Sequence, residues 1–76
     1  MDPKYDNFKI IENVAFGGEN VIMPFVNIYG CKIGKHTKVG PFVEIQKGTE
    51  IGDKCNICSH SFICRGVKIG NETFIG

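Results

Sequence analysis

Residues 33–76 read IGKHTKVGPFVEIQKGTEIGDKCNICSHSFICRGVKIGNETFIG, and an aliphatic residue recurs there every six positions. Counted in sixes from Val21, nine of ten members of this column are Val or Ile: Val21, Asn27, Ile33, Val39, Ile45, Ile51, Ile57, Ile63, Ile69 and Ile75. A period of six fits neither the turn of a helix nor the alternation of a flat strand. It predicts a three-sided β-coil of about 18 residues, stacked at the strand spacing of about 4.8 Å.

A second column supports the coil. Four positions after each aliphatic residue comes a residue that is small or β-branched in eight of nine cases: Phe25, Cys31, Thr37, Val43, Thr49, Cys55, Ser61, Val67 and Thr73. Both columns are predicted to point inward, and Gly eases the corners. In this register Asn27 faces the core, where its amide either caps backbone groups or shapes a site. We predict a lead-in strand or cap over residues 1–20 and β-helix repeats over residues 21–76.

The composition describes one small folded domain. The 76 residues are 42% apolar and 22% charged with a net charge of +1, which gives no electrostatic signature of a nucleic-acid or membrane-surface protein. The start, residues 1–6, has no apolar segment typical of a secretory signal, and no apolar run has the length of a membrane span. Four cysteines in such a chain suggest reduced thiols in a cytoplasmic protein. Because residues 75–76 open a new repeat, we interpret the chain as the amino-terminal piece of a longer protein.

The sides of the predicted coil differ in character. One side carries Lys32, Glu50 and Lys68 outward, and this solvated charge ladder suggests no chemistry. A second side is predicted to carry Val26, Glu44 and Phe62 outward, and the third carries Asn20, Lys38, Asn56 and Phe74. A corner beside the second side stacks Met23–Pro24, Pro41–Phe42 and Ser59–His60. Outward aromatic residues in a small solenoid need cover, and a neighbouring subunit is the simplest source.

The pattern Ile-Gly-x-x-Thr/Cys-x resembles the hexapeptide repeat of left-handed β-helix acyltransferases. The resemblance implies an all-β, left-handed parallel β-helix, here of about three coils, and a homotrimer with active sites between subunits. The strings VNIYG (26–30), FVEIQKG (42–48) and SHSFIC (59–64) are similar to nucleotide-sugar 3-N-acetyltransferases. Those enzymes use acetyl-CoA and act on UDP- or dTDP-linked amino sugars in bacterial surface-polysaccharide synthesis. In related enzymes a catalytic His or Asn follows an Ile-Gly like residues 75–76, so that residue would lie beyond Gly76.

Four residues are the candidate site. His60 is the catalytic candidate: it would bind the acceptor or take the amine proton, or else pack on Phe42 at a subunit interface. Glu44 and Gln46 would hold sugar hydroxyls or the amino group, or serve the trimer interface. Arg65, with Lys47 one coil below, would meet a diphosphate, or both are ordinary surface residues.

Metal chemistry is not expected. Cys55, Cys58, His60 and Cys64 are close in sequence and suggest zinc, but the register turns Cys55 inward and puts Cys58 and Cys64 on different corners. A carbonic anhydrase of the same fold needs three converging histidines, and the sequence has two. The remaining alternatives are a non-catalytic β-helix assembly module and a hexapeptide acetyltransferase with another acceptor.

Overall fold

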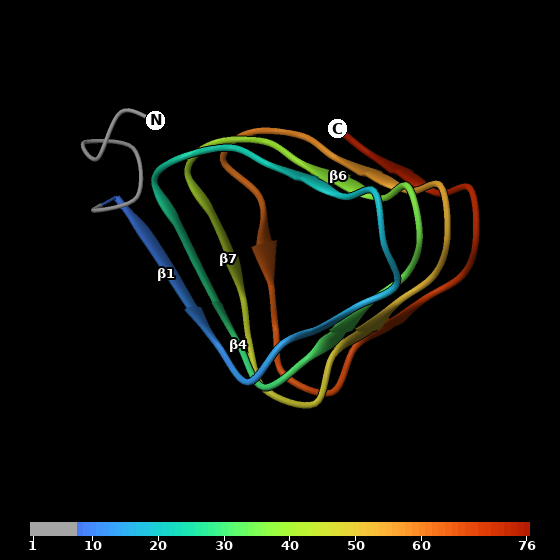
Figure 1. Ribbon diagram of the computed structural model, residues 1–76, viewed down its shortest axis with the longest axis horizontal. Coiled ribbons are helices and arrows are strands. Elements are labelled where there is room, and N and C mark those ends of the chain that lie inside the picture. The colour runs from blue at the N-terminus through green and yellow to red at the C-terminus, as the bar shows by residue number, and fades with distance from the viewer. Residues whose placement is uncertain (1–7) are drawn as a thin grey trace.

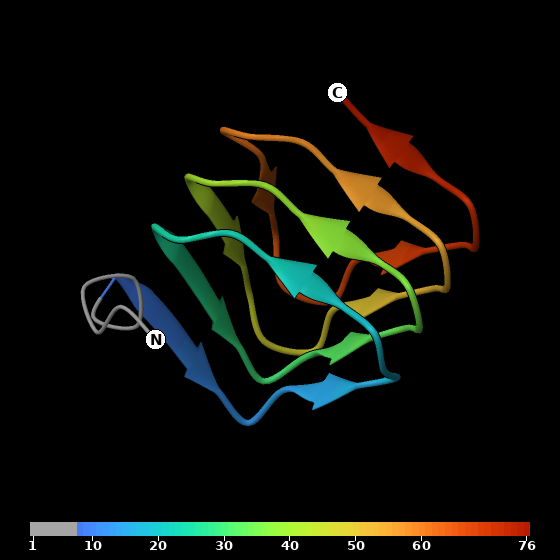
Figure 2. The same ribbon diagram turned by 45° about the horizontal axis from the view of Figure 1, so that its top comes forward.

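Twelve short parallel strands form a three-sided β-solenoid in the computed structural model, which describes residues 8–76 (Figure 1). Each side is a parallel sheet of four strands, and successive coils lie directly above one another (Figure 2). Sheet A contains β1 (Lys9–Glu12), β4 (Val26–Tyr29), β7 (Val43–Ile45) and β10 (Phe62–Ile63). Sheet B contains β2 (Ala15–Phe16), β5 (Lys32–Ile33), β8 (Glu50–Ile51) and β11 (Lys68–Ile69). Sheet C contains β3 (Val21–Ile22), β6 (Lys38–Val39), β9 (Asn56–Ile57) and β12 (Phe74–Ile75).

The predicted all-β, left-handed β-helix is confirmed, but with about four coils instead of about three. Strands β1 and β2 fall inside the segment predicted as a lead-in, and each pairs in parallel with a strand of the next coil. Residues 9–22 therefore make a coil of their own. The expectation about residues 1–6 lies outside the described residues.

The inward column is shifted by one residue before Ile33. Ile28 pairs with Ile45 at a separation of 17, whereas Ile33 pairs with Ile51 at a separation of 18. The corner between β4 and β5 is thus one residue shorter than the corner above it, and Gly30 makes the tight turn with φ of 62°. The inward residues there are Ile22 and Ile28, and the prediction of Val21 and Asn27 was wrong.

The same shift corrects four further placements. Val26, predicted to point outward, is 4% exposed, and Asn27 takes the outward position beside Glu44. Phe25, predicted to point inward, instead turns the corner and stacks on Phe42. Val21, not Asn20, takes the outward position beside Lys38. The Asn20 side-chain amide instead donates to the carbonyl oxygens of Gly34 and Thr37, at 2.7 and 3.1 Å. The predicted pair Met23–Pro24 is likewise shifted by one residue. The corner therefore stacks Pro24–Phe25, Pro41–Phe42 and Ser59–His60.

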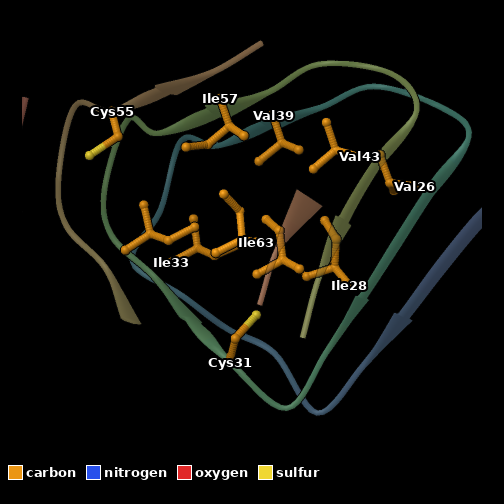
Figure 3. Packing of buried hydrophobic residues seen from close by; sticks show 11 residues of the cluster. Val26, Ile28, Cys31, Ile33, Val39, Val43, Cys55, Ile57 and Ile63 are labelled. Atoms are coloured by element: carbon orange, nitrogen blue, oxygen red, sulfur yellow. The ribbon is translucent and has the colours of Figure 1, made fainter. Parts of the chain in front are cut away.

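The core is a column of aliphatic side chains inside the coils (Figure 3). Ile28, Ile45 and Ile57 are fully buried, and Cys31 and Cys55 are buried as predicted. Thr37 and Thr49 are also fully buried, because each hydroxyl donates to a backbone carbonyl, of Gly52 and of Cys64. Val67, Ile69 and Ile75 are partly buried against this core.

Side chains link the coils at the corner between sheets B and C, which we call the Asx corner (Lys35, Asp53 and Asn71). The Lys35 amide donates to Asp53 Oδ1 at 2.9 Å, and the Asp53 amide donates to Asn71 Oδ1 at 2.8 Å. Each carboxamide or carboxylate therefore serves the backbone of the coil beneath it. A Cβ on Gly34 would meet Asp53 Oδ1 and lie 2.5 Å from the Gly52 carbonyl carbon, so this arrangement requires glycine there.

The described part of the chain holds no helix long and apolar enough to cross a membrane.

Candidate functional site

The outward face of sheet A carries the candidate acidic residue. Parallel register places Asn27, Glu44 and Phe62 in one outward row on β4, β7 and β10. Alternation along the strand sends Val43 and Ile45 into the core on either side of Glu44. Tyr29 follows Asn27 by two residues and Gln46 follows Glu44 by two residues, so both lie beyond this row.

A ladder of rings borders this face at the corner between sheets C and A. We call it the aromatic ladder: Phe8, Phe25, Phe42 and His60. Successive ring centroids lie 4.8, 5.1 and 5.1 Å apart, which is the offset-stacking range. His60 thus packs on Phe42 within one chain, at the corner that the sequence predicts.

The backbone beneath this ladder turns at positive φ. Phe25, Phe42 and His60 have φ of 65, 58 and 63°, in the left-handed region that bulky side chains rarely adopt. Each such residue costs about 1–2 kcal/mol relative to glycine in this conformation. At the corner between sheets A and B the corresponding positions are Asn13, Gly30, Gly48 and Gly66. The corner between sheets B and C also turns on non-glycine residues, His36, Lys54 and Glu72, with φ of 59, 56 and 57°.

A groove of about 610 Å³ lies between the aromatic ladder and the outward face of sheet A. Its wall includes Asn27, Glu44, His60, Ser61 and Phe62 together with the phenylalanine rings. Of the four predicted site residues, the structure brings Glu44 and His60 to this groove. Gln46 and Arg65 do not line it and lie toward the corner with sheet B.

Hydrogen bonds connect Glu44, Gln46 and Arg65. Gln46 Nε2 donates to Glu44 Oε2 at 3.0 Å, and the Arg65 backbone amide donates to Gln46 Oε1 at 3.3 Å. The Tyr29 hydroxyl approaches the same Glu44 oxygen at 3.5 Å, a long contact. Arg65 joins this network through its backbone, so its guanidinium remains available to a ligand.

The cysteines are free thiols, and Cys31 has a shifted pKa. Burial disfavours the thiolate and raises the pKa of Cys31 to about 11, which makes this thiol inert at neutral pH. Cys58 follows β9 of sheet C and Cys64 follows β10 of sheet A, so the prediction of different corners is confirmed. Among residues 8–76, no three His, Cys, Asp or Glu side chains lie close enough to hold a metal ion.

The side predicted to be solvated shows the expected charge ladder. Lys32, Glu50 and Lys68 lie in register on sheet B, and Lys68 Nζ is 3.5 Å from Glu50 Oε2. Both side chains are at least half exposed, so this ion pair contributes little stability.

Sequence reasoning missed three residues at this site. Asn27 and Phe25 line the groove and Tyr29 contacts Glu44, and all three precede the short corner at Gly30. The available signal was a pair of anomalies, an amide in the aliphatic column and a phenylalanine in the small column. Both disappear when the count before Ile33 is shifted by one residue.

Comparison with known proteins places this geometry in context. Residues 30–65 match the family described as bacterial transferase hexapeptide (six repeats). The chain is 31% identical over 72 residues to the Bifunctional protein GlmU of Nitrosomonas eutropha, an alignment covering 88% of this chain and 16% of the relative. It is 33% identical over 61 residues to GlmU of Acidithiobacillus ferrooxidans, covering 80% of this chain and 13% of the relative. GlmU of Blochmanniella pennsylvanica is 36% identical over 70 residues, covering 91% and 15%.

These relatives are much longer than this chain, which spans about 13–16% of their length. No solved structure matches the chain at a significant level.

Proposed function

Because residues 30–65 carry the bacterial transferase hexapeptide repeat, we propose that the chain belongs to an acyltransferase that moves an acetyl group from acetyl-CoA. The proposed acceptor is the amino group of a nucleotide-linked amino sugar. The repeat match carries the transferase proposal, and the resemblance of residues 26–30, 42–48 and 59–64 to 3-N-acetyltransferases supports the acceptor. The groove on sheet A supports the proposed location, since all three segments border it.

Glu44 and His60 are the proposed acceptor contacts in the groove. The Glu44 carboxylate accepts hydrogen bonds from an amino group or a sugar hydroxyl, and the His60 ring binds the sugar beside Phe42. Gln46 and Arg65 extend the proposed site toward sheet B, where the guanidinium would meet the diphosphate in bidentate fashion.

The proposed reaction needs little covalent chemistry from the protein. The neutral amine nitrogen attacks the thioester carbonyl carbon, the C–N bond forms and the C–S bond breaks. The surplus amine proton passes to a base, for which His60 is the candidate in this chain, and coenzyme A leaves as its thiol after protonation. No metal is required. Holding both substrates in line is worth about 7–11 kcal/mol in such reactions, so positioning is the main task of the site.

The proposed assembly is a homotrimer in the cytoplasm. Phe42 and Phe62 are 53% and 60% exposed, and a neighbouring subunit would cover them beside the groove. Free thiols fit a reducing compartment. The natural full-length protein should therefore sediment as a trimer.

The test is coenzyme A release by the full-length protein, with acetyl-CoA and a panel of nucleotide-linked amino sugars. We expect release with a 3-amino sugar, loss of release with the matched 3-hydroxy sugar, and an acetylated product by mass spectrometry. Release with a 4-amino sugar or a hydroxyl acceptor would keep the transferase and replace the acceptor.

The exposed aromatic ladder favours one competing function, a non-catalytic assembly module. A correctly folded trimer that releases no coenzyme A with any acceptor, and that acetyl-CoA does not protect against heat, would favour that module.

A further inference from the structure

The carboxylate of Glu44 is held from one side only. Gln46 Nε2 and the Tyr29 hydroxyl both approach Oε2, at 3.0 and 3.5 Å. Glu44 itself lines the groove. With Oε2 occupied on the side away from the groove, Oε1 is the oxygen left for a ligand.

Gln46 is fixed at both ends of its amide. Its nitrogen donates to Glu44, and its oxygen accepts from the Arg65 backbone amide at 3.3 Å, so the two amide ends are assigned by their partners. A backbone amide on the next coil cannot swing away as a side chain can. Gln46 thus transmits the rigid position of β10 and its following corner to a carboxylate on β7.

Gln46 is absent from the groove wall, although it lies only two residues after Glu44, just past the end of β7. A ligand in the groove therefore meets Glu44 without meeting Gln46. One of the two Nε2 hydrogens and one of the two Oε1 lone pairs are used by protein groups, which fixes the orientation of the amide.

We infer that Gln46 is a positioning residue that acts through Glu44, and that it fixes the carboxylate so that Oε1 receives the amino group of the acceptor. This inference rests on the proposed function and replaces direct substrate binding by Gln46. A held carboxylate binds better than a mobile one, because its rotamers need not be restricted when the ligand arrives.

The test is a double-mutant cycle in the full-length protein with Gln46→Met, Glu44→Gln and the double variant. We expect Gln46→Met to raise the KM for the amino-sugar acceptor about tenfold, the effect of one charge-assisted hydrogen bond, with the KM for acetyl-CoA unchanged. In the Glu44→Gln background, Gln46→Met should change the acceptor KM by less than about twofold. Independent, additive effects would show that Gln46 meets the acceptor itself and would overturn the inference.

Glu50→Gln is the matched control, since Glu50 is an outward carboxylate on β8 that pairs with Lys68 away from the groove. It should leave both KM values unchanged. If the wild-type protein acetylates no acceptor, the proposed function fails, and crystal structures of wild type and Gln46→Met then decide the inference separately. A Glu44 carboxylate displaced in Gln46→Met supports it, and one in its wild-type position overturns it.

Discussion

The Asx corner and the aromatic ladder both turn the chain from one sheet to the next, but they connect successive coils through different chemistry. At the Asx corner Asp53 and Asn71 each accept a hydrogen bond from a backbone amide of the coil beneath, at 2.9 and 2.8 Å. At the aromatic ladder the coils meet through stacked rings, and Phe25 and Phe42 remain 43% and 53% exposed. The first corner is complete within the chain. The second leaves apolar surface beside a groove, which is where a ligand or a second subunit has something to gain.

The largest expected effect is at the Asx corner, with Gly34→Ala. The new Cβ would meet Asp53 Oδ1 and the backbone of Gly52, and backbone atoms cannot move aside, so we expect a loss of about 3 kcal/mol in unfolding free energy. Gly70→Ala is the matched control, because nothing lies within 4 Å of its Cβ position. Denaturant unfolding of both variants measures the difference, and equal losses would show that the corner is not tightly packed.

The pH dependence of the unfolding free energy tests the interior of the solenoid, at Cys31, independently of both corners. Burial holds the Cys31 pKa at about 11 against an ordinary 9.0, so the folded state favours the neutral thiol. The contribution of this thiol to the unfolding free energy is therefore complete below about pH 9 and is lost as the pH rises through 11. The loss amounts to about 2 kcal/mol at pH 11. The difference in unfolding free energy between wild type and Cys31→Ala isolates this thiol. A difference that stays constant from pH 8 to 11 would contradict the buried position.

The hydrogen bond of the Asx corner should be worth less than its packing. Asp53→Ala removes the acceptor of the Lys35 amide at an exposed position, and we expect a loss of about 1 kcal/mol. Asp53→Asn retains Oδ1 and should be nearly neutral. In the double variant Gly34→Ala/Asp53→Ala, part of the Gly34→Ala loss should return, because the side chain that met the new Cβ is gone.

The smallest effect on stability is expected at the aromatic ladder. Phe42→Asn loses two ring contacts but places a residue that tolerates the left-handed region at φ of 58°. These terms oppose each other, so the unfolding free energy of the isolated chain should change by less than about 1 kcal/mol. If a subunit covers this corner, the same variant should lower the trimer population in sedimentation velocity. A large loss in the isolated chain would mean that the ladder stabilises the fold itself.

The sequence predicts the molecule well on one side of Gly30 and poorly on the other. From Ile33 onward every inward and outward assignment follows the period of six, which is why Glu44 and His60 were found. Before Ile33 one corner is a residue shorter, which exchanges the inward and outward positions. The period of six therefore predicts Asn27 inward and Val26 outward, opposite to the structure. The shortened repeat left its signal only at Phe25 and Asn27, because at the next position in the column Val21 and Ile22 are both aliphatic.

The site was less predictable than the fold because it depends on side-chain direction. Glu44 and Gln46 both point outward from one strand face, and the sequence treated them alike. Only the folded structure reveals that the Gln46 amide is hydrogen-bonded at both ends while Glu44 lines the groove.

The corners of this solenoid are hydrogen-bonded across coils as the strands are. Residues at positive φ donate to a carbonyl of the coil below, His36 to Gly18, Lys54 to Lys35, Phe42 to Phe25 and His60 to Pro41, at 2.8–3.2 Å. Turns that normally exchange amide protons freely and admit proteases are therefore protected here. Opening must then proceed coil by coil from an end, so slow hydrogen exchange in the middle coils and resistance to internal cleavage should accompany each other.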